Sequence, residues 1–159
     1  MNERVPMTPH GYQKLLAEFK YVREVLRPQI VRDIEEARAH GDISENSEYE
    51  DAKERQAAAE GRVREIEARL GLAEVIDIAK VTPTSRVIFG TTVDLEDQDT
   101  GDSVSYRLVG TEEADVRNGL ISYSSPIGKA LLGRSVGDEV RFETPKGTRT
   151  VAITAVHYR

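Results

Sequence analysis

The chain has 159 residues, 31% of them charged and 38% hydrophobic, with a formal net charge of −6 and no cysteine. The negative charge argues against a general nucleic-acid binder, since phosphate contacts need clustered lysine and arginine, and the lack of cysteine excludes disulfides, thiolate metal sites and cysteine nucleophiles. Charged residues interrupt the first thirty positions and no long apolar run follows, so we expect a cytoplasmic protein without a membrane anchor.

Two long segments carry the apolar repeat of helices. In the first, apolar residues recur every three or four positions, at Leu15, Phe19, Val22, Leu26, Ile30, Ile34 and Ala37. In the second, a heptad rhythm runs through Tyr49, Ala52, Gln56, Ala59, Val63, Ile66, Leu70 and Ala73. Two such seams joined by a short turn bury their apolar faces only by folding back. We therefore predict an antiparallel coiled-coil hairpin in residues 1–79, with an arm roughly 45 Å long.

The ends of these helices carry recognisable signals. Thr8 followed by Pro9 is a good N-cap and first-turn pair, and Gly41 supplies the left-handed residue that ends the first helix. Pro28 lies inside the first helical pattern, where it removes one backbone hydrogen bond. We expect a kink at Pro28 and no break, because packing along the seam holds the helix together.

The turn between the two segments is acidic. Asp42-Ile43-Ser44-Glu45 matches a capping box, and that structural interpretation explains this stretch taken alone. The charge density exceeds what a cap requires, however, because Lys53 is surrounded by Asp42, Glu45, Glu48, Glu50, Asp51 and Glu54. Such crowding implies a partner or a cation. Carboxylate oxygens suit Mg²⁺, but two of them alone would hold it weakly.

From Lys80 onward the helical rhythm stops and short β-branched or aromatic runs alternate with turn signals. We predict strands at residues 86–93, 103–109, 120–124, 139–143 and 148–157. Hairpin turns are expected at residues 99–102 and 145–147, and one short helix is expected at residues 126–132. The fold class is therefore α+β, with a compact antiparallel-sheet domain in residues 80–159.

Common catalytic signatures do not appear. The Gly128-Lys129 pair would need glycine at position 123 to form a phosphate-binding loop, and Tyr123 stands there. The three histidines, His10, His40 and His157, are scattered without metal-ligand spacing, so we interpret them as structural. His40 precedes the acidic turn, but a histidine in the last turn of a helix is also favoured by the helix dipole.

The residues around the acidic turn resemble the tip motif of a known family. Residues 36–49, EARAHGDISENSEY, with Ala52-Lys53-Glu54 after them, are similar to the coiled-coil tip of the bacterial Gre transcript-cleavage factors, nearest to the GreA-like branch. Further similarity lies at residues 62–70, 75–77 and 90–93, and in the segment SPIGKALLG at residues 125–133. The resemblance thus covers nearly the whole chain.

This resemblance implies an N-terminal coiled coil and a C-terminal FKBP-like domain, and it implies RNA polymerase as the partner. In that family the C-terminal domain docks on the β′ coiled coil at the mouth of the secondary channel, while the arm enters the channel. The tip acids then help bind the second Mg²⁺ of the polymerase and orient a water, so that the polymerase cuts backtracked RNA by a two-metal mechanism. The factor itself would be an accessory monomer and no enzyme, with no cofactor bound stably alone.

The resemblance also assigns roles to individual residues. Asp42 and Glu45 match the two essential tip acids, with Asp42 as the metal ligand and Glu45 helping with metal or water, and Ser44 and Tyr49 support the tip. Arg38 and Lys53 match positions that contact the 3′ segment of backtracked RNA, although an intrahelical ion pair explains them equally well. The β′ contact maps to Ser124, Ser125, Pro126 and Ile127, where the alternative is an ordinary strand end before a proline-started helix.

Glu50 and Asp51 depart from the family pattern, which more often has uncharged or weakly basic residues there. We therefore expect weak cleavage of long backtracked RNA. Two other functions stay open. A relative that enters the channel can inhibit transcription without stimulating cleavage, although the tip agrees with the cleavage-competent pattern. An FKBP-like isomerase or chaperone rests on fold analogy alone.

Overall fold

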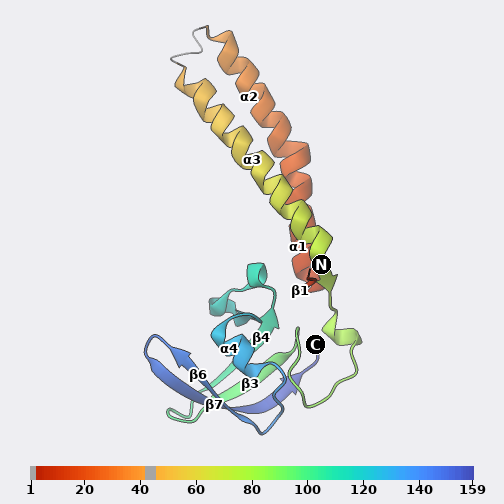
Figure 1. The fold of residues 1–159 in the computed structure, drawn as a ribbon, viewed down its shortest axis with the longest axis vertical. Coiled ribbons are helices and arrows are strands. Elements are labelled where there is room, and N and C mark those ends of the chain that lie inside the picture. The colour runs from red at the N-terminus through yellow and green to blue at the C-terminus, as the bar shows by residue number, and fades with distance from the viewer. Residues whose placement is uncertain (1–2, 42–45) are drawn as a thin grey trace. The chain divides into compact units, whose positions relative to one another are not determined.

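A helical hairpin and a five-stranded sheet dominate the computed structural model, which describes residues 3–41 and 46–159 (Figure 1). Packing divides the described residues into two units. The first, which we call the arm, contains Tyr12–Ala73. The second, the sheet unit, contains Arg4–Gly11 and Glu74–Arg159. The chain is therefore of mixed helix and sheet class, with the long helices in its N-terminal half.

The first helical segment runs through α1 (Pro9–Tyr21), a π-helical turn η1 (Val22–Leu26) and α2 (Arg27–Ala39). The Thr8 hydroxyl accepts a 3.0 Å hydrogen bond from the Gly11 amide, which confirms the predicted helix start. Pro28 stands in the first turn of α2, directly after η1. A proline has no amide to donate to the preceding turn, and a π-turn is one way in which a helix accommodates that loss. As predicted, the helical path continues through Pro28.

The second segment is α3 (Ser47–Leu72), which packs against α2 and η1. The apolar seam predicted from the sequence forms the core of the arm, with buried Val22, Ile30, Ile34, Ala52, Ala59 and Val63. Three ion pairs link the helices on the flanks of this seam: Arg27 to Glu60, Arg62 to Glu18, and Arg55 to Asp33. The predicted helical hairpin is thus confirmed in the described residues.

The sheet unit contains β3 (Thr92–Asp97), β4 (Ser103–Val109), β5 (Leu120–Ser122), β6 (Glu139–Thr144) and β7 (Gly147–His157), in the order β5-β4-β3-β7-β6. A separate pair joins β1 (Val5–Met7) to β2 (Ala73–Val75). Three pairings of the large sheet are antiparallel, but β5 runs parallel to β4. The prediction of an antiparallel sheet is therefore wrong for β5. The two 3₁₀ turns between these strands, Thr111–Glu113 and Val116–Asn118, return the chain so that β5 starts in the same direction as β4.

The first strand of the large sheet begins later than predicted. The sequence run at residues 86–93 is apolar, yet β3 starts at Thr92 and Gly90 has a φ of 91°. Val87 and Phe89 are buried without belonging to a strand. Residues in a buried loop are apolar for the same reason as residues in a buried strand. The apolar pattern therefore predicts burial here correctly but not a strand. The predicted turns at residues 99–102 and 145–147 do connect neighbouring strands.

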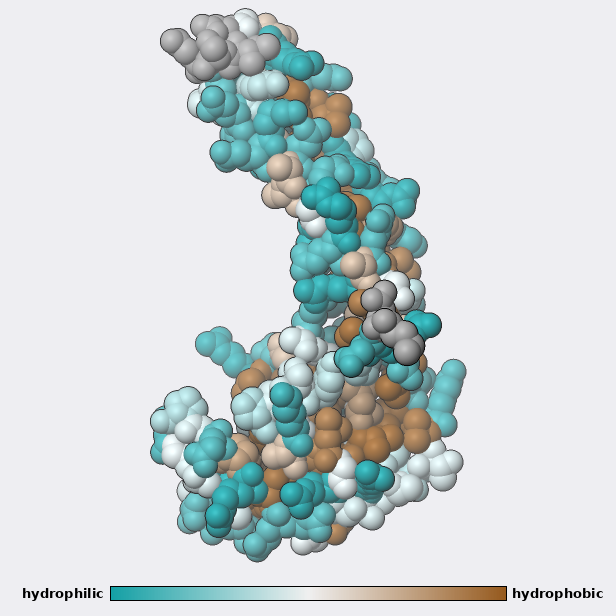
Figure 2. Space-filling view, viewed as in Figure 1, coloured by the Kyte–Doolittle hydropathy of each residue, from teal (hydrophilic) through white to brown (hydrophobic). Residues whose placement is uncertain are grey.

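The core of the sheet unit lies between the sheet and α4 (Pro126–Leu131), which packs against β6 and β5. It contains buried Val87, Val93, Leu95, Leu108, Ile121, Leu131, Val140, Val151 and Ile153. In the view of Figure 2 the arm is mostly hydrophilic, and hydrophobic residues gather over the sheet unit. Among the described residues no helix is long and apolar enough to span a bilayer.

Candidate functional site

The end of the hairpin, residues 38–53, is the first candidate site, and we call it the tip. Asp42, Ser44 and Glu45, which the sequence analysis singled out, lie outside the described residues, and so does the capping box predicted from them. The described residues fix both ends of that segment. On one side α2 ends at Ala39 and Gly41 has a φ of 105°, a backbone conformation that glycine adopts without strain.

Asn46 forms the other end and caps α3. Its Oδ1 accepts a 3.1 Å hydrogen bond from the Tyr49 amide, and its Nδ2 donates to the carbonyl of Ala37 at 2.6 Å. One carboxamide therefore satisfies a free amide at the start of α3 and adds a hydrogen bond to the Ala37 carbonyl near the end of α2, which also accepts from the His40 amide at 3.2 Å. Asn46 was not predicted as a cap, because the capping-box match at Asp42-Ile43-Ser44-Glu45 placed the cap of the second helix at Asp42.

Tyr49 and Arg38 meet across the hairpin. The guanidinium carbon of Arg38 lies 6.0 Å from the centre of the Tyr49 ring, and Tyr49 also packs on the apolar core of the arm. A cation over an aromatic ring at this distance is weakly attractive. Both residues were predicted to belong to the tip, and the structure brings them together.

Lys53 and Asp51 have different surroundings. Lys53 donates to Gln56 at 3.1 Å on the exposed face of α3. Asp51 pairs with Arg55 at 3.2 Å, and Arg55 also pairs with Asp33 of α2 at 3.0 Å. Hydrogen bonds from Gln29 and then from Arg55 hold the pKa of Asp33 below its ordinary value of 3.8. The negative charge of Asp51 is therefore partly neutralised, whereas Glu50 is exposed.

A shallow acidic hollow lies beside the tip, between α2 and α3. It is lined by Asp33, Glu36, Ala37, Glu48, Asp51 and Arg55. His40 approaches it from the end of α2, with Nδ1 3.3 Å from Glu48. In residues 3–41 and 46–159 no group of three or more histidine or carboxylate side chains is arranged to hold a metal ion.

The second candidate site is the start of α4, where four residues were predicted to contact a partner. The Ser125 hydroxyl caps α4 by accepting from the Gly128 amide at 3.1 Å, and it donates to the carbonyl of Ser122 at 2.7 Å. Ser124 and Pro126 are exposed. The Ser124 hydroxyl belongs to a cluster, 2.8 Å from that of Ser122 and 3.2 Å from that of Thr111.

Ile127, the fourth of these residues, lines a pocket of about 380 Å³ in the sheet unit. Its walls are mainly apolar, from Leu95, Val104, Tyr106, Val116, Ile121, Phe142 and Val151, and Asp97, Asp102, Thr144 and Arg149 complete it. A concave apolar site with a few polar groups is the usual form of a binding pocket. This pocket was not predicted from the sequence. The alternating pattern of β3 and β4 indicates a buried face but does not show that the face is concave.

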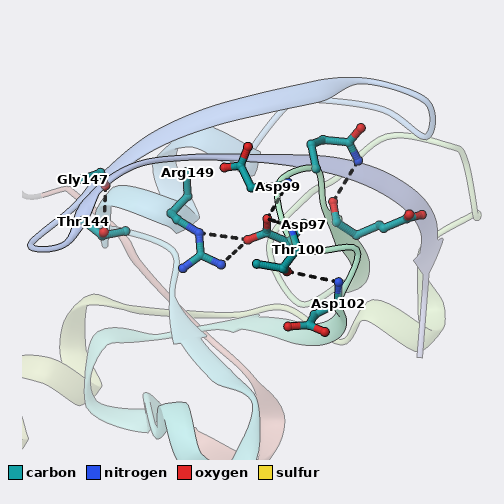
Figure 3. A network of polar contacts seen from close by, with 9 residues as sticks. Asp97, Asp99, Thr100, Asp102, Thr144, Gly147 and Arg149 are labelled. Atoms are coloured by element: carbon teal, nitrogen blue, oxygen red, sulfur yellow. Dashed lines mark hydrogen bonds and ion pairs between the residues drawn. The ribbon is translucent and has the colours of Figure 1, made fainter.

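Asp97 organises the polar end of this pocket (Figure 3). Its side chain is only 7% exposed, and Arg149 donates to Oδ2 from two nitrogens, one at 2.9 Å. Oδ1 accepts from the amides of Asp99 and Thr100 at 2.8 and 3.1 Å. Arg149 first, and then these two amides, hold the pKa of Asp97 below its ordinary value of 3.8.

Comparison with known protein families accounts for nearly the whole chain. Residues 5–75 match the model of the transcription elongation factor N-terminal domain. Residues 82–158 match the model described as transcription elongation factor, GreA/GreB, C-terminal. The predicted division at residues 79 and 80 falls between the two matches.

Curated relatives match over nearly their full length. Transcription elongation factor GreA of Verminephrobacter eiseniae is 46% identical, with 98% of each chain covered. GreA of Syntrophobacter fumaroxidans is 48% identical over 96% of this chain and 97% of that protein. Among solved structures, GreA factor homolog 1 of Thermus thermophilus is 32% identical over 98% of this chain and 99% of that one, with a TM-score of 0.43.

Proposed function

Because the chain belongs to the GreA/GreB family of transcription elongation factors, we propose that it stimulates bacterial RNA polymerase to cleave its own backtracked transcript. The match to GreA proteins over 98% of the chain carries this proposal. The arm, which lies within residues 1–79, enters the secondary channel, and residues 80–159 form an FKBP-like domain that docks at the channel mouth. The factor acts as a monomer and contributes groups to the polymerase active site without being an enzyme alone.

The construction of the arm supports this role. An element that works inside a channel must reach the active centre and stay straight, and α3 with 26 residues is about 39 Å long. The continuous apolar seam and the ion pairs on its flanks stiffen the two helices against each other. At Ala52 and Ala59 the side chains are small and buried, so the helices approach closely near the tip.

The tip supplies the chemistry. Asp42 and Glu45 would hold a Mg²⁺ ion together with polymerase residues, Asp42 as the metal ligand and Glu45 helping with the metal or with the attacking water. Carboxylate oxygens are the ligands that this hard cation prefers, and the ion in such a site polarises the phosphate and activates water. Ser44 and Tyr49 support the loop, and Asn46 fixes its far end to α2.

Two basic residues beside the loop meet the 3′ segment of the RNA. Lys53 is exposed on α3, and Arg38 is exposed at the end of α2 over the Tyr49 ring. Both side chains are exposed, so both can turn to a phosphate when RNA is present. The exposed carboxylate of Glu50 opposes this attraction and disfavours long backtracked RNA.

Docking uses the start of α4 and the pocket beside it. Ser124 and Pro126 offer an exposed edge, and Ile127 continues this edge into the apolar pocket. A coiled-coil tip of the β′ subunit that presents an apolar side chain suits such a surface, because burial of that side chain supplies most of the binding energy.

The test is RNA cleavage in stalled, backtracked elongation complexes with Mg²⁺, comparing wild type, Asp42→Asn/Glu45→Gln and buffer. We expect wild type to shorten the transcript from its 3′ end, and the variant to bind polymerase without doing so. RNA without polymerase should stay intact. If wild type binds and slows transcription without cleavage, the factor is a channel-binding inhibitor. Proline-peptide isomerisation by the full chain without binding to polymerase would support the isomerase instead.

A further inference from the structure

The pocket in the sheet unit has one charged end, and its charges do not cancel. Asp97 and Arg149 neutralise each other through their paired hydrogen bonds. Asp102, which also lines the pocket, is exposed. Within the described residues, the Asp102 carboxylate accepts no hydrogen bond and forms no ion pair. One negative charge thus remains at the end of an apolar cavity.

The turn that carries Asp102 is held in place by buried Asp97 and its partner Arg149, whose side chain is partly exposed. Asp97 binds the amides of Asp99 and Thr100, and the Thr100 hydroxyl accepts from the Asp102 amide at 3.2 Å. Arg149 anchors Asp97 from the neighbouring strand β7. This chain of contacts, drawn in Figure 3, holds the turn between β3 and β4 that carries Asp102, and Asp102 lines the pocket. Arg149 and Asp97 are therefore positioning residues.

The apolar part of the pocket is open to a partner. Val104 and Val116, which line it, are 41% and 67% exposed, although large apolar side chains are usually buried. Leu95 and Ile121 form buried parts of the lining. A cavity of about 380 Å³ lies in the range of real binding pockets, roughly 300–1,000 Å³. Its size and lining suit an aliphatic side chain.

We infer that the pocket takes a protein segment that presents an aliphatic side chain with a lysine or arginine beside it, and that Asp102 selects the basic residue. The inference rests on the proposed docking to RNA polymerase and names the chemistry of the docked segment. The aliphatic side chain is buried in the apolar part of the pocket. The basic side chain meets Asp102 at the charged end, where complementary charge contributes mainly specificity and association rate.

The experiment measures the affinity of the full-length chain for bacterial core RNA polymerase by fluorescence anisotropy, at about 50 mM and about 300 mM KCl. Asp102→Asn removes the carboxylate and keeps the shape of the side chain. Glu96→Gln is the matched control, because Glu96 is exposed on the same hairpin but points to the opposite face of β3 and does not line the pocket. Both variants should unfold at the wild-type temperature.

We expect Asp102→Asn to weaken binding about two- to fivefold at low salt and to show almost no loss at high salt, while Glu96→Gln binds like wild type. Equal affinities of the two variants at low salt would overturn the inference and leave the docking proposal intact. A loss for Asp102→Asn that is the same at both salt concentrations would also overturn it, because the role of Asp102 would not be electrostatic. If wild type itself does not bind polymerase, the proposed docking fails, and the inference fails with it.

Discussion

The side chain of Asn46 joins the two helices of the arm, because its Nδ2 donates to the carbonyl of Ala37 at 2.6 Å. The same carboxamide caps α3 through the Tyr49 amide. Residues 42–45 lie between these two fixed points. A single neutral side chain therefore ties the start of α3 to the end of α2, and this structural role of Asn46 is separate from the chemical roles proposed for Asp42 and Glu45.

The first prediction separates the cap from the bond to Ala37. Asn46→Ser keeps an oxygen for the Tyr49 amide and cannot reach Ala37, whereas Asn46→Ala loses both contacts. We expect the alanine variant to lose about 1 kcal/mol of unfolding free energy and the serine variant less. With saturating amounts of either variant, polymerase should cleave backtracked RNA more slowly than it does with wild type. The affinity of both variants for polymerase should be unchanged. If the serine variant stimulates RNA cleavage at the wild-type rate, the hydrogen bond to Ala37 does not position the tip.

The second prediction concerns the two acidic residues that depart from the family pattern. Arg55 partly neutralises Asp51, and Glu50 is exposed, so the two carboxylates oppose RNA unequally. A charge about 10 Å from a phosphate in water contributes roughly 0.4 kcal/mol, or about twofold in rate. We expect Glu50→Gln to raise cleavage of long backtracked RNA about twofold and Asp51→Asn to raise it less. The measurement is the rate of RNA cleavage in complexes backtracked by two and by many nucleotides. Equal increases for the two variants on long backtracked RNA would contradict the prediction.

The helical half of the fold could be predicted because its information is local. The apolar steps from Leu15 to Ala37 and from Tyr49 to Leu70 are visible within two continuous helical segments, and their burial follows from the pairing of these segments. The strand predicted at residues 86–93 failed for a related reason. An apolar run reports burial, and the strand there begins only at Thr92, so Val87 and Phe89 are buried from a loop.

The pocket and its charged end could not be predicted, because they depend on pairing between distant residues. Asp97 and Arg149 are 52 positions apart and meet only when β3 lies beside β7. Their sequence neighbours include several other charged residues, so charge alone does not mark them. The docking role proposed for residues 124–127 rests on the family resemblance, and only the fold shows that Ile127 lines a cavity.

The third prediction is a pH dependence that comes from Asp97. Its folded pKa lies below the ordinary value of 3.8, so the pair with Arg149 contributes its full stability above that value. The contribution is lost as the pH falls from about 3.8 through the folded pKa. We expect the unfolding free energy of wild type to fall over this range, and that of Asp97→Asn to fall less steeply. Urea unfolding between about pH 6 and about pH 3 would measure both slopes.

A control for this prediction comes from the partner side chain. Arg149→Met removes the cation and leaves Asp97 buried with its two amide bonds, so the folded pKa of Asp97 should rise toward its ordinary value. Carboxyl chemical shifts of the full chain, followed by NMR during titration, report this directly. An unchanged Asp97 midpoint in the methionine variant would mean that the amides, and not Arg149, dominate the lowered pKa.

The fourth prediction uses one substitution at two glycines. A Cβ at buried Gly128 would lie 2.2 Å from the carbonyl oxygen of Ser122, so Gly128→Ala must displace the start of α4 and its Ser125 cap. We expect a loss of about 1–3 kcal/mol in unfolding free energy and weaker binding to polymerase, with near-normal cleavage once the factor is saturating. Gly71→Ala, which meets nothing within 4 Å in α3, should instead stabilise the arm by up to about 1 kcal/mol and bind normally. Gly128→Ala could lose stability as predicted and still bind polymerase as tightly as Gly71→Ala does. In that case the start of α4 is not the docking surface, and residues 124–127 are only a strand end and a helix cap.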